Sequence, residues 1–128
     1  RIGQIEKLSC AIEKNFAQTP AGLWLTERVW ESGLIPDLTR TGVRYALVDD
    51  YHFIAAGYEK ERLGGYYHSE EGGEKIALFP ISQALRYALP FKPVETAIGT
   101  IKACRRDPGD AAIIFDDAEK FGMWPGTH

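Results

Sequence analysis

Carboxylic side chains follow three apolar stretches of this sequence, shortly after each stretch ends. They are Glu27, the pair Asp49-Asp50 and the pair Asp116-Asp117. If the apolar stretches are parallel strands, their carboxyl ends meet at one edge of a sheet, where α/β enzymes place their active sites. Carboxylates from distant parts of the sequence would then converge. Acidic residues after strands also cap the helices that follow, so the spacing alone leaves a catalytic and a structural role open.

Tryptophans lie beside two of these acidic positions and favour a sugar as the ligand. Trp24 and Trp30 bracket Glu27, and Trp124 follows Asp117. An indole ring is a large flat surface on which the apolar face of a pyranose ring can stack. A single tryptophan is more simply explained as part of the core. Two carboxylate positions that each have a neighbouring tryptophan predict a carbohydrate site.

The elements that would position these residues are predicted by the spacing of apolar side chains. Apolar residues recur at three- and four-residue steps over residues 5–16, which predicts a helix that ends before Thr19-Pro20. Pro36 and Pro93 suit the starts of two further helices. In the second of these, one helical face carries the apolar residues Val94, Ala97, Ile98, Ile101 and Cys104.

Continuous apolar runs between the helices predict buried strands near residues 22–26, 44–48, 75–79 and 111–115. Residues 57–73 mix charges with glycines, and we expect them to form an excursion from the main scaffold. A hairpin within this segment is compatible with its sequence. Apolar strands that alternate with helices are typical of a parallel sheet covered on both faces. The predicted fold class is therefore α/β, as one domain or a contiguous piece of one.

The composition is that of an ordinary globular protein. Of 128 residues, 45% are hydrophobic and 26% are charged, which is enough to build a core without disulfides or a structural metal. Fifteen Lys and Arg against 18 Asp and Glu give a net charge of −3, which argues against a nucleic-acid partner. No apolar run approaches the roughly 18 to 20 residues that a membrane span requires.

No cofactor or metal ion is expected. Cys10 and Cys104 show neither metal-ligand spacing nor a disulfide-rich pattern, so inert packing in a reducing, cytoplasmic environment is the prediction. The glycine pairs Gly64-Gly65 and Gly72-Gly73 do not follow strands as the glycines of a phosphate-binding loop do, which argues against a nucleotide site.

Two longer stretches resemble the motifs of glycoside hydrolase family 57. Residues 22–31 (GLWLTERVWE) resemble that family's nucleophile motif, and residues 115–125 (FDDAEKFGMWP) resemble its acid motif. Residues 49–53 and the segments Leu85-Arg86-Tyr87 and Pro90-Phe91 are similar to the branch that contains 4-α-glucanotransferases and related α-amylases. The resemblance covers the whole chain and implies a distorted barrel of seven parallel strands, of which residues 1–128 form a single segment.

The resemblance also implies a role for each matching residue. Glu27 matches the nucleophile of a retaining reaction, and Asp117 matches the general acid/base. Asp117 is chosen over Asp116 because the family motif Asp-x-Glu-x-Phe-Gly begins at Asp117 here. Four further residues match positions that line the sugar site or orient the carboxylates of that site, namely Trp24, Arg28, Glu119 and Trp124. His52 is a candidate for a further sugar contact or for a structural hydrogen bond.

Other motifs of the family have no match in this sequence. They are an early histidine motif and a glutamate motif before the nucleophile, and an aspartate motif after the acid. The sequence also begins Arg1-Ile2-Gly3 without an initiator methionine and ends in a turn-rich stretch. We therefore expect a segment truncated at both ends, inactive by itself, within an active parent enzyme.

The resemblance implies that the parent acts on α-1,4-glucans as a 4-α-glucanotransferase, through a glycosyl-enzyme intermediate. An α-amylase would share the same chemistry and use water as the acceptor. A carbohydrate-binding remnant without turnover is a second alternative. Polysaccharide deacetylation on a similar barrel is disfavoured, because it needs metal ligands and His52 and His68 lack paired spacing. The sequence does not predict the oligomeric state.

Overall fold

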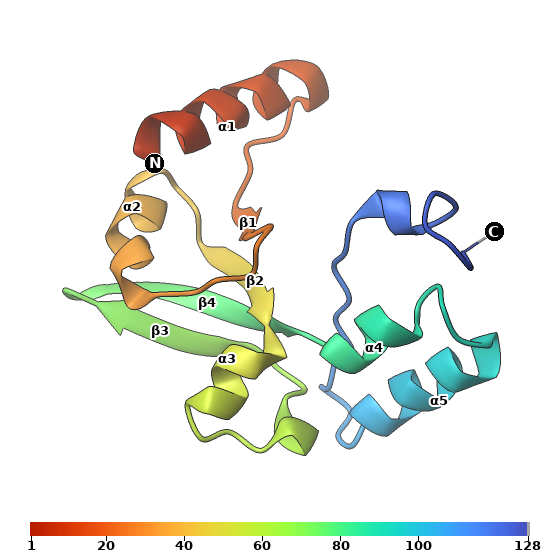
Figure 1. Ribbon diagram of the computed structural model, residues 1–128. Helices are drawn as coiled ribbons and strands as arrows, with labels where there is room; N and C mark the ends of the chain where they lie inside the picture. The colour runs from red at the N-terminus through yellow and green to blue at the C-terminus, as the bar shows by residue number, and fades with distance from the viewer. Residues whose placement is uncertain (128) are drawn as a thin grey trace. The chain divides into compact units, whose positions relative to one another are not determined.

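The computed structural model describes residues 1–127 and contains both helices and a mixed β-sheet (Figure 1). The chain divides into two compact units. The first unit comprises residues 1–48 and 66–79, and the second comprises residues 49–65 and the chain from residue 80 onward. No helix within residues 1–127 is long and apolar enough to cross a membrane.

A four-stranded sheet with strand order β1-β2-β4-β3 contains all the strands of the described chain. Strand β1 (Gly22–Trp24) runs parallel to β2 (Tyr45–Asp49), and Gly22 lies opposite Tyr45. Strand β3 (Tyr67–Glu71) runs antiparallel to β4 (Glu74–Ile81). The sequence predicted a parallel sheet. This is correct for β1 and β2, but the antiparallel pairing of β3 with β4 makes the sheet mixed.

The antiparallel pair is a hairpin closed by two glycines. Gly72 and Gly73 have φ angles of +61° and +84°, the left-handed conformation that two-residue hairpin turns require. The polar side chains of β3 gave only a weak strand signal, because this strand alternates half-buried and exposed positions instead of being continuously apolar. Strand β3 and the turn fall in the predicted excursion over residues 57–73, and β4 covers the strand predicted over residues 75–79.

The helices of the first unit begin and end close to their predicted positions. Helix α1 (Ile2–Phe16) ends before Pro20, and α2 (Ile35–Arg40) carries Pro36 in its first turn. A short 3₁₀ helix, η1 (Ser32–Leu34), precedes α2. The core of this unit consists of apolar side chains from α2 and the sheet, namely Ile35, Leu38, Val43, Ala46, Val48, Ile76 and Leu78.

The second unit is mainly helical. Its elements are α3 (Asp50–Ala55), η2 (Lys60–Arg62), α4 (Gln83–Ala88), α5 (Val94–Cys104) and η3 (Ala118–Lys120). Ser82 caps α4 by accepting a hydrogen bond from the Leu85 amide at 3.3 Å. The core residues are Phe53, Ile81, Leu85, Ala88 and Ala97.

The strand predicted over residues 111–115 is wrong: these residues form an extended segment without regular secondary structure (Figure 1). A strand needs a continuous ladder of hydrogen bonds to one neighbour. Here the Ala111 amide donates to the Gly64 carbonyl and the Ile113 carbonyl accepts from the Ser82 amide, so the bonds go to two different segments. The apolar run predicted a buried strand, and its burial was also wrong: Ala111, Ala112 and Phe115 are exposed, and Ile113 and Ile114 are half-buried.

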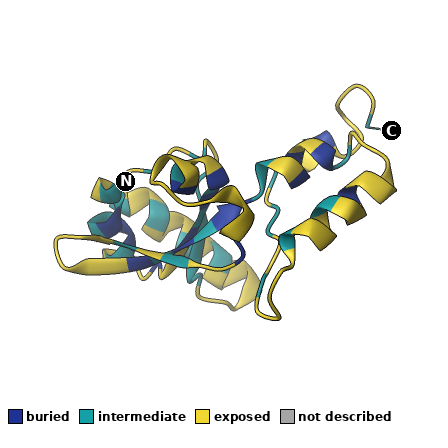
Figure 2. Cartoon of the chain, turned by 90° about the horizontal axis from the view of Figure 1, so that it is seen from below, coloured by how far each residue is buried: buried dark blue, intermediate teal, exposed yellow. Residues whose placement is uncertain are grey.

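Helix α5 has the predicted bounds but a narrower buried face. Of the five apolar residues that share one helical face, only Ala97 is buried, and Ile98 and Ile101 are exposed. Figure 2 shows α5 as a mostly exposed helix with a short buried patch. The half-buried positions on the same side as Ala97 are Thr100 and Cys104, so α5 packs through small side chains.

Candidate active site

The predicted nucleophile lies in a tight turn directly after β1. The Arg28 amide donates to the Leu25 carbonyl at 2.8 Å, which closes the turn around Thr26 and Glu27. The Glu27 side chain is exposed. Because β1 and β2 are parallel, this turn leaves the sheet at the edge where both strands have their carboxyl ends. That is the edge at which the sequence placed the active-site carboxylates.

Arg28 has an unusual backbone conformation for a residue with a side chain. Its φ angle is +59°, in the left-handed region that few non-glycine residues adopt. Such conformations gather at functional sites, where the surrounding structure holds them. Glu27 and Arg28 lie after the last residue of β1, so the alternation of side chains between the two faces of a strand does not apply to them.

The glycine that opens the nucleophile motif is required by its neighbour on β2. A Cβ atom on Gly22 would overlap the aromatic ring of Tyr45, its partner in the parallel ladder. The Tyr45 ring packs edge-to-face on Phe79, with centroids 5.6 Å apart. Trp24 lies two residues after Gly22, half-buried, opposite Leu47. The close approach of Gly22 to Tyr45 therefore fixes the register that carries Trp24.

In the second unit, Asp116 lies in a network of buried charges. Its side chain is 3% exposed, and its Oδ2 accepts a hydrogen bond from the Lys120 ammonium at 2.6 Å. Its Oδ1 accepts from the amide of Asp117 at 3.0 Å. Burial opposes ionisation of Asp116, but Lys120, the Asp117 amide and Arg86 outweigh it and lower the pKa of this carboxyl.

This geometry separates the two neighbouring aspartates. Both oxygens of Asp116 are engaged, and its lowered pKa keeps it ionised, so it is unsuited to donate a proton. Asp117 is half-buried and precedes η3, whose first turn closes when the Lys120 amide donates to the Asp117 carbonyl at 3.2 Å. The choice of Asp117 as the acid, made from the motif, stays a prediction.

Arg86 on α4 completes the network and was not predicted as a site residue. Its Nη1 donates to both carboxylate oxygens of Asp49 at 3.1 Å. Its Nε lies 3.6 Å from Asp116 Oδ2, which is an ion pair. The sequence did hold a signal, because a buried carboxylate needs a cation beside it and Arg86 is the one basic residue of α4.

The remaining predicted residues of the second unit lie around the acid motif and on α3. The Trp124 ring centroid is 5.3 Å from the Lys120 ammonium and 6.3 Å from the Phe91 ring. The first of these contacts is a cation–π interaction. Glu119 is exposed within η3. His52 lies on α3 against the ring of Tyr51, with centroids 5.9 Å apart.

The structure therefore gathers the predicted residues into two sets. The first unit holds Trp24, Glu27 and Arg28 on β1 and the turn that follows it. The second unit holds Asp117, Glu119 and Trp124, beside a hollow of about 270 Å³ lined by Ile114, Phe115, Asp116 and Phe121, and it also holds His52. Their roles as catalytic and sugar-binding residues stay predictions.

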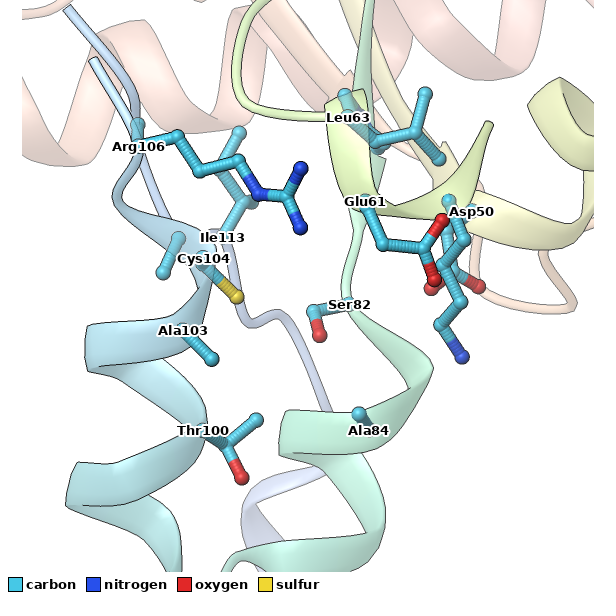
Figure 3. A pocket seen from close by; sticks show the side chains of 14 residues that line it. Asp50, Glu61, Leu63, Ser82, Ala84, Thr100, Ala103, Cys104, Arg106 and Ile113 are labelled. Atoms are coloured by element: carbon cyan, nitrogen blue, oxygen red, sulfur yellow. The ribbon is translucent and has the colours of Figure 1, made fainter. Parts of the chain in front are cut away.

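A second hollow of the second unit contains none of the predicted residues (Figure 3). Its volume is about 230 Å³, and Asp50, Ser82, Thr100 and Cys104 are among its lining residues. Burial raises the pKa of Asp50, although its Oδ2 accepts from the Gln83 amide at 3.2 Å. Burial and the Asp50 charge raise the pKa of the Cys104 thiol, which agrees with an inert cysteine.

Comparison with known proteins shows the family. The chain belongs to glycosyl hydrolase family 57, whose model matches residues 1–128. It is 47% identical to alpha-amylase 1 of Dictyoglomus thermophilum and 46% identical to the 4-alpha-glucanotransferase of Thermococcus litoralis, in each case over 100% of this chain and 19% of the relative.

The solved structure of the Thermococcus litoralis 4-alpha-glucanotransferase is also similar to this chain. The TM-score is 0.92 at 46% sequence identity, and the match covers 99% of this chain and 20% of the other. This chain therefore spans about a fifth of the length of the relatives that it matches.

Proposed function

We propose that the full-length protein is a retaining 4-α-glucanotransferase that acts on α-1,4-glucans. The observation that carries this proposal is the acid motif: Asp116 is engaged by Lys120 and by the Asp117 amide, which leaves the neighbouring Asp117 as the proton donor. Membership of glycosyl hydrolase family 57 and the names of the relatives support the substrate class.

The proposed reaction has two steps. In the first, Glu27 attacks the anomeric carbon while Asp117 protonates the departing sugar oxygen, and a glycosyl-enzyme forms. In the second, Asp117 takes a proton from a sugar hydroxyl, which attacks the anomeric carbon and releases Glu27. This mechanism needs the two carboxyl groups to be about 5 to 5.5 Å apart. In this proposal residues 1–128 form one segment of a seven-stranded barrel.

The other predicted residues surround the sugar in this proposal. Trp24 and Trp124 provide aromatic surfaces for pyranose rings. Arg28, Glu119 and His52 bind hydroxyl groups or orient the carboxylates. The reaction uses carboxyl groups alone and involves no cofactor, and we place the protein in the cytoplasm.

Hydrolysis is the second candidate function, because relatives at 45–47% identity are named alpha-amylase. The two functions differ only in the second step, where water replaces the sugar hydroxyl as the acceptor. The carboxylates act in the same way in both.

The products formed from a short maltooligosaccharide distinguish the two. The full-length protein is incubated with a single maltooligosaccharide, and chain lengths and reducing ends are followed over time. A transferase gives both longer and shorter chains at a constant number of reducing ends. Only shorter chains with rising reducing ends would identify an α-amylase. The Glu27→Gln variant serves as the inactive control, and wild-type protein without either product pattern would contradict the proposal.

A further inference from the structure

We propose that Arg86 is a positioning residue for the general acid: its guanidinium holds Asp116, and Asp116 holds the backbone of Asp117 in place. This inference rests on the proposed function, because it assigns the acid role to Asp117. Arg86 touches neither Asp117 nor any sugar-stacking residue in the contacts described above, so its effect passes through Asp116.

The first step of the argument is the burial of the ion pairs. The side chains of Arg86, Asp116 and Lys120 are each exposed by 7% or less. Ion pairs at this depth are screened little by solvent, and removal of one partner leaves a buried charge without compensation. The position of Asp116 is therefore controlled by two cations, with Lys120 on its own turn and Arg86 on α4.

The second step is the link from Asp116 to the catalytic position. The Asp116 Oδ1 accepts the hydrogen bond from the amide of Asp117 at 3.0 Å. A side chain that bonds to the next amide fixes the backbone between the two residues. The direction in which Asp117 leaves the main chain depends on that backbone, so a shift of the Asp116 carboxylate moves the Asp117 carboxyl.

The third step is the rigidity of the frame that carries Arg86. The Ser82 amide donates to the Ile113 carbonyl at 2.8 Å, which ties the start of α4 to the segment that leads to Asp116. The Gln83 amide donates to Asp50 Oδ2 at 3.2 Å, next to the Asp49 that Arg86 binds. Two hydrogen bonds, one of them to the side chain of Asp50, thus join the start of α4 to two segments far away in the sequence, and the Arg86 side chain contacts the same two segments at Asp49 and Asp116.

The test uses the full-length protein with variants at this position. Arg86→Met removes the charge, and Arg86→Lys keeps a charge but loses the planar fork that reaches two carboxylates. Arg62→Met is the matched control, because Arg62 is an exposed arginine of the same unit that pairs with Glu59 at 2.7 Å. Each variant is assayed on a maltooligosaccharide and on an α-glucosyl fluoride, whose leaving group needs no protonation.

A misplaced acid lowers the rate of the first step only where the leaving group must be protonated. The ratio kcat/KM reports this first step, whereas kcat also includes the second step, in which Asp117 acts as the base. We expect Arg86→Met to lower kcat/KM on the maltooligosaccharide by about 100-fold, the size of effect that a misplacement of about 1 Å produces. On the fluoride the loss should be less than about tenfold, Arg86→Lys should fall between wild type and Arg86→Met, and Arg62→Met should match wild type on both. A purely structural role would remove folded enzyme and lower both activities by one factor, and that result, or no loss at all, overturns the inference.

The Asp117→Asn variant separates this inference from the proposed function. If Asp117→Asn loses the maltooligosaccharide reaction and keeps the fluoride reaction, the acid assignment holds, and a failure of Arg86→Met to follow the same pattern overturns the positioning role alone. If Asp117→Asn loses neither reaction, or loses both by the same factor, the acid assignment and the inference fall together.

A double variant tests the path through Asp116. If Arg86 acts only through Asp116, Arg86→Met combined with Asp116→Asn should be no worse than the more damaging single variant, within about twofold. Losses that multiply would mean that Arg86 and Asp116 act independently, and they would overturn the proposed path.

Discussion

The nucleophile segment and the acid segment hold their carboxylates by different means. Glu27 lies in a backbone turn closed by the bond from the Arg28 amide to Leu25, and its side chain is exposed. Asp117 follows a buried carboxylate that is engaged by Lys120 and faced by Arg86. The first segment depends on backbone geometry and close packing, and the second depends on charge.

This difference fits the roles proposed for the two residues. A nucleophile has to present a carboxylate oxygen to the anomeric carbon. A general acid has to hold and release a proton in a defined direction, so its surroundings must be fixed in both charge and position. Changes that disturb packing should therefore affect the first segment, and changes that disturb charge should affect the second.

The largest effect should come from removal of the nucleophile. Glu27→Ala or Glu27→Gln in the full-length protein should lower turnover by on the order of 10⁴-fold or more, because no covalent intermediate can form. The fold should be preserved, since the Glu27 side chain is exposed. Circular dichroism and the rate of glucan conversion check both expectations.

Azide provides the control for this variant. In Glu27→Ala the small anion can occupy the space of the carboxylate and attack the anomeric carbon, so it should restore some cleavage and yield a glycosyl azide of inverted configuration. Asp117→Asn should not be rescued in this way. Rescue of Asp117→Asn to an inverted azide, instead of Glu27→Ala, would exchange the two assignments.

The next largest effect distinguishes the two neighbouring aspartates. Asp117→Asn should lower activity on natural glucans by about 10² to 10⁴-fold, the usual contribution of general acid catalysis. Asp116→Asn should cost less, because an asparagine oxygen can still accept the hydrogen bond from the Asp117 amide. If Asp116→Asn is the more damaging in folded protein, the acid is Asp116 and our interpretation of this motif is wrong by one residue.

Much of the fold could be predicted because local patterns determine it. The apolar spacing of α1, the prolines at the starts of α2 and α5, and the apolar runs of β1, β2 and β4 all gave the correct element. The segment 111–115 failed because an apolar run shows neither which backbone groups will pair nor whether the fold covers it, and three of its five residues are exposed. The strand β3 was missed for the opposite reason, since its residues are polar and its pairing depends on the turn at Gly72-Gly73.

The candidate site divides in the same way. The motif residues could be chosen from the sequence because Glu27 and Asp117 lie within recognisable stretches. The role of Arg86 could not, because it binds a residue 37 positions away and this contact exists only in the folded chain. The need for glycine at position 22 could not be predicted either, because it comes from the Tyr45 ring on the neighbouring strand.

The third prediction disturbs packing beneath the nucleophile turn. Gly22→Ala places a Cβ atom into the Tyr45 ring, and it should destabilise the protein by about 1–3 kcal/mol, the usual cost of overpacking. Activity should fall as well, because β1 carries Trp24 and leads into Glu27. Gly33→Ala is the control, since its Cβ would meet no atom within 4 Å. Equal melting temperatures for the two variants would contradict the proposed contact.

The smallest effects concern pH, and they have opposite signs at two aspartates of the second unit. The pKa of Asp116 is lowered in the folded state by Lys120, the Asp117 amide and Arg86, in spite of its burial. The Asp116 carboxylate therefore stabilises the fold fully above about pH 3.9, the pKa of an aspartate in the unfolded chain. This contribution is lost as the pH falls through the lower pKa that Asp116 has in the folded state. Asp116→Asn should be less stable than wild type at neutral pH, and the difference should shrink in acid. A stability difference between the variant and the wild type that does not change with pH would mean that the charge of Asp116 does not contribute to stability.

Asp50 should behave in the opposite way, because burial raises its pKa. The native state then binds the Asp50 proton more tightly than the unfolded state does. Its stabilising contribution is complete below about pH 3.9 and is lost as pH rises through the folded pKa. The Asp50→Asn variant keeps a side-chain oxygen that can accept from the Gln83 amide, but its side chain does not titrate. The free energy of unfolding of this variant should therefore rise relative to that of the wild type between about pH 4 and about pH 7. Urea unfolding at several pH values measures how the difference in free energy of unfolding between the variant and the wild type changes with pH. A constant effect of the amide group on stability does not alter that change. A difference that falls with pH instead would mean that Asp50 is stabilised as a carboxylate, and the contrast with Asp116 would disappear.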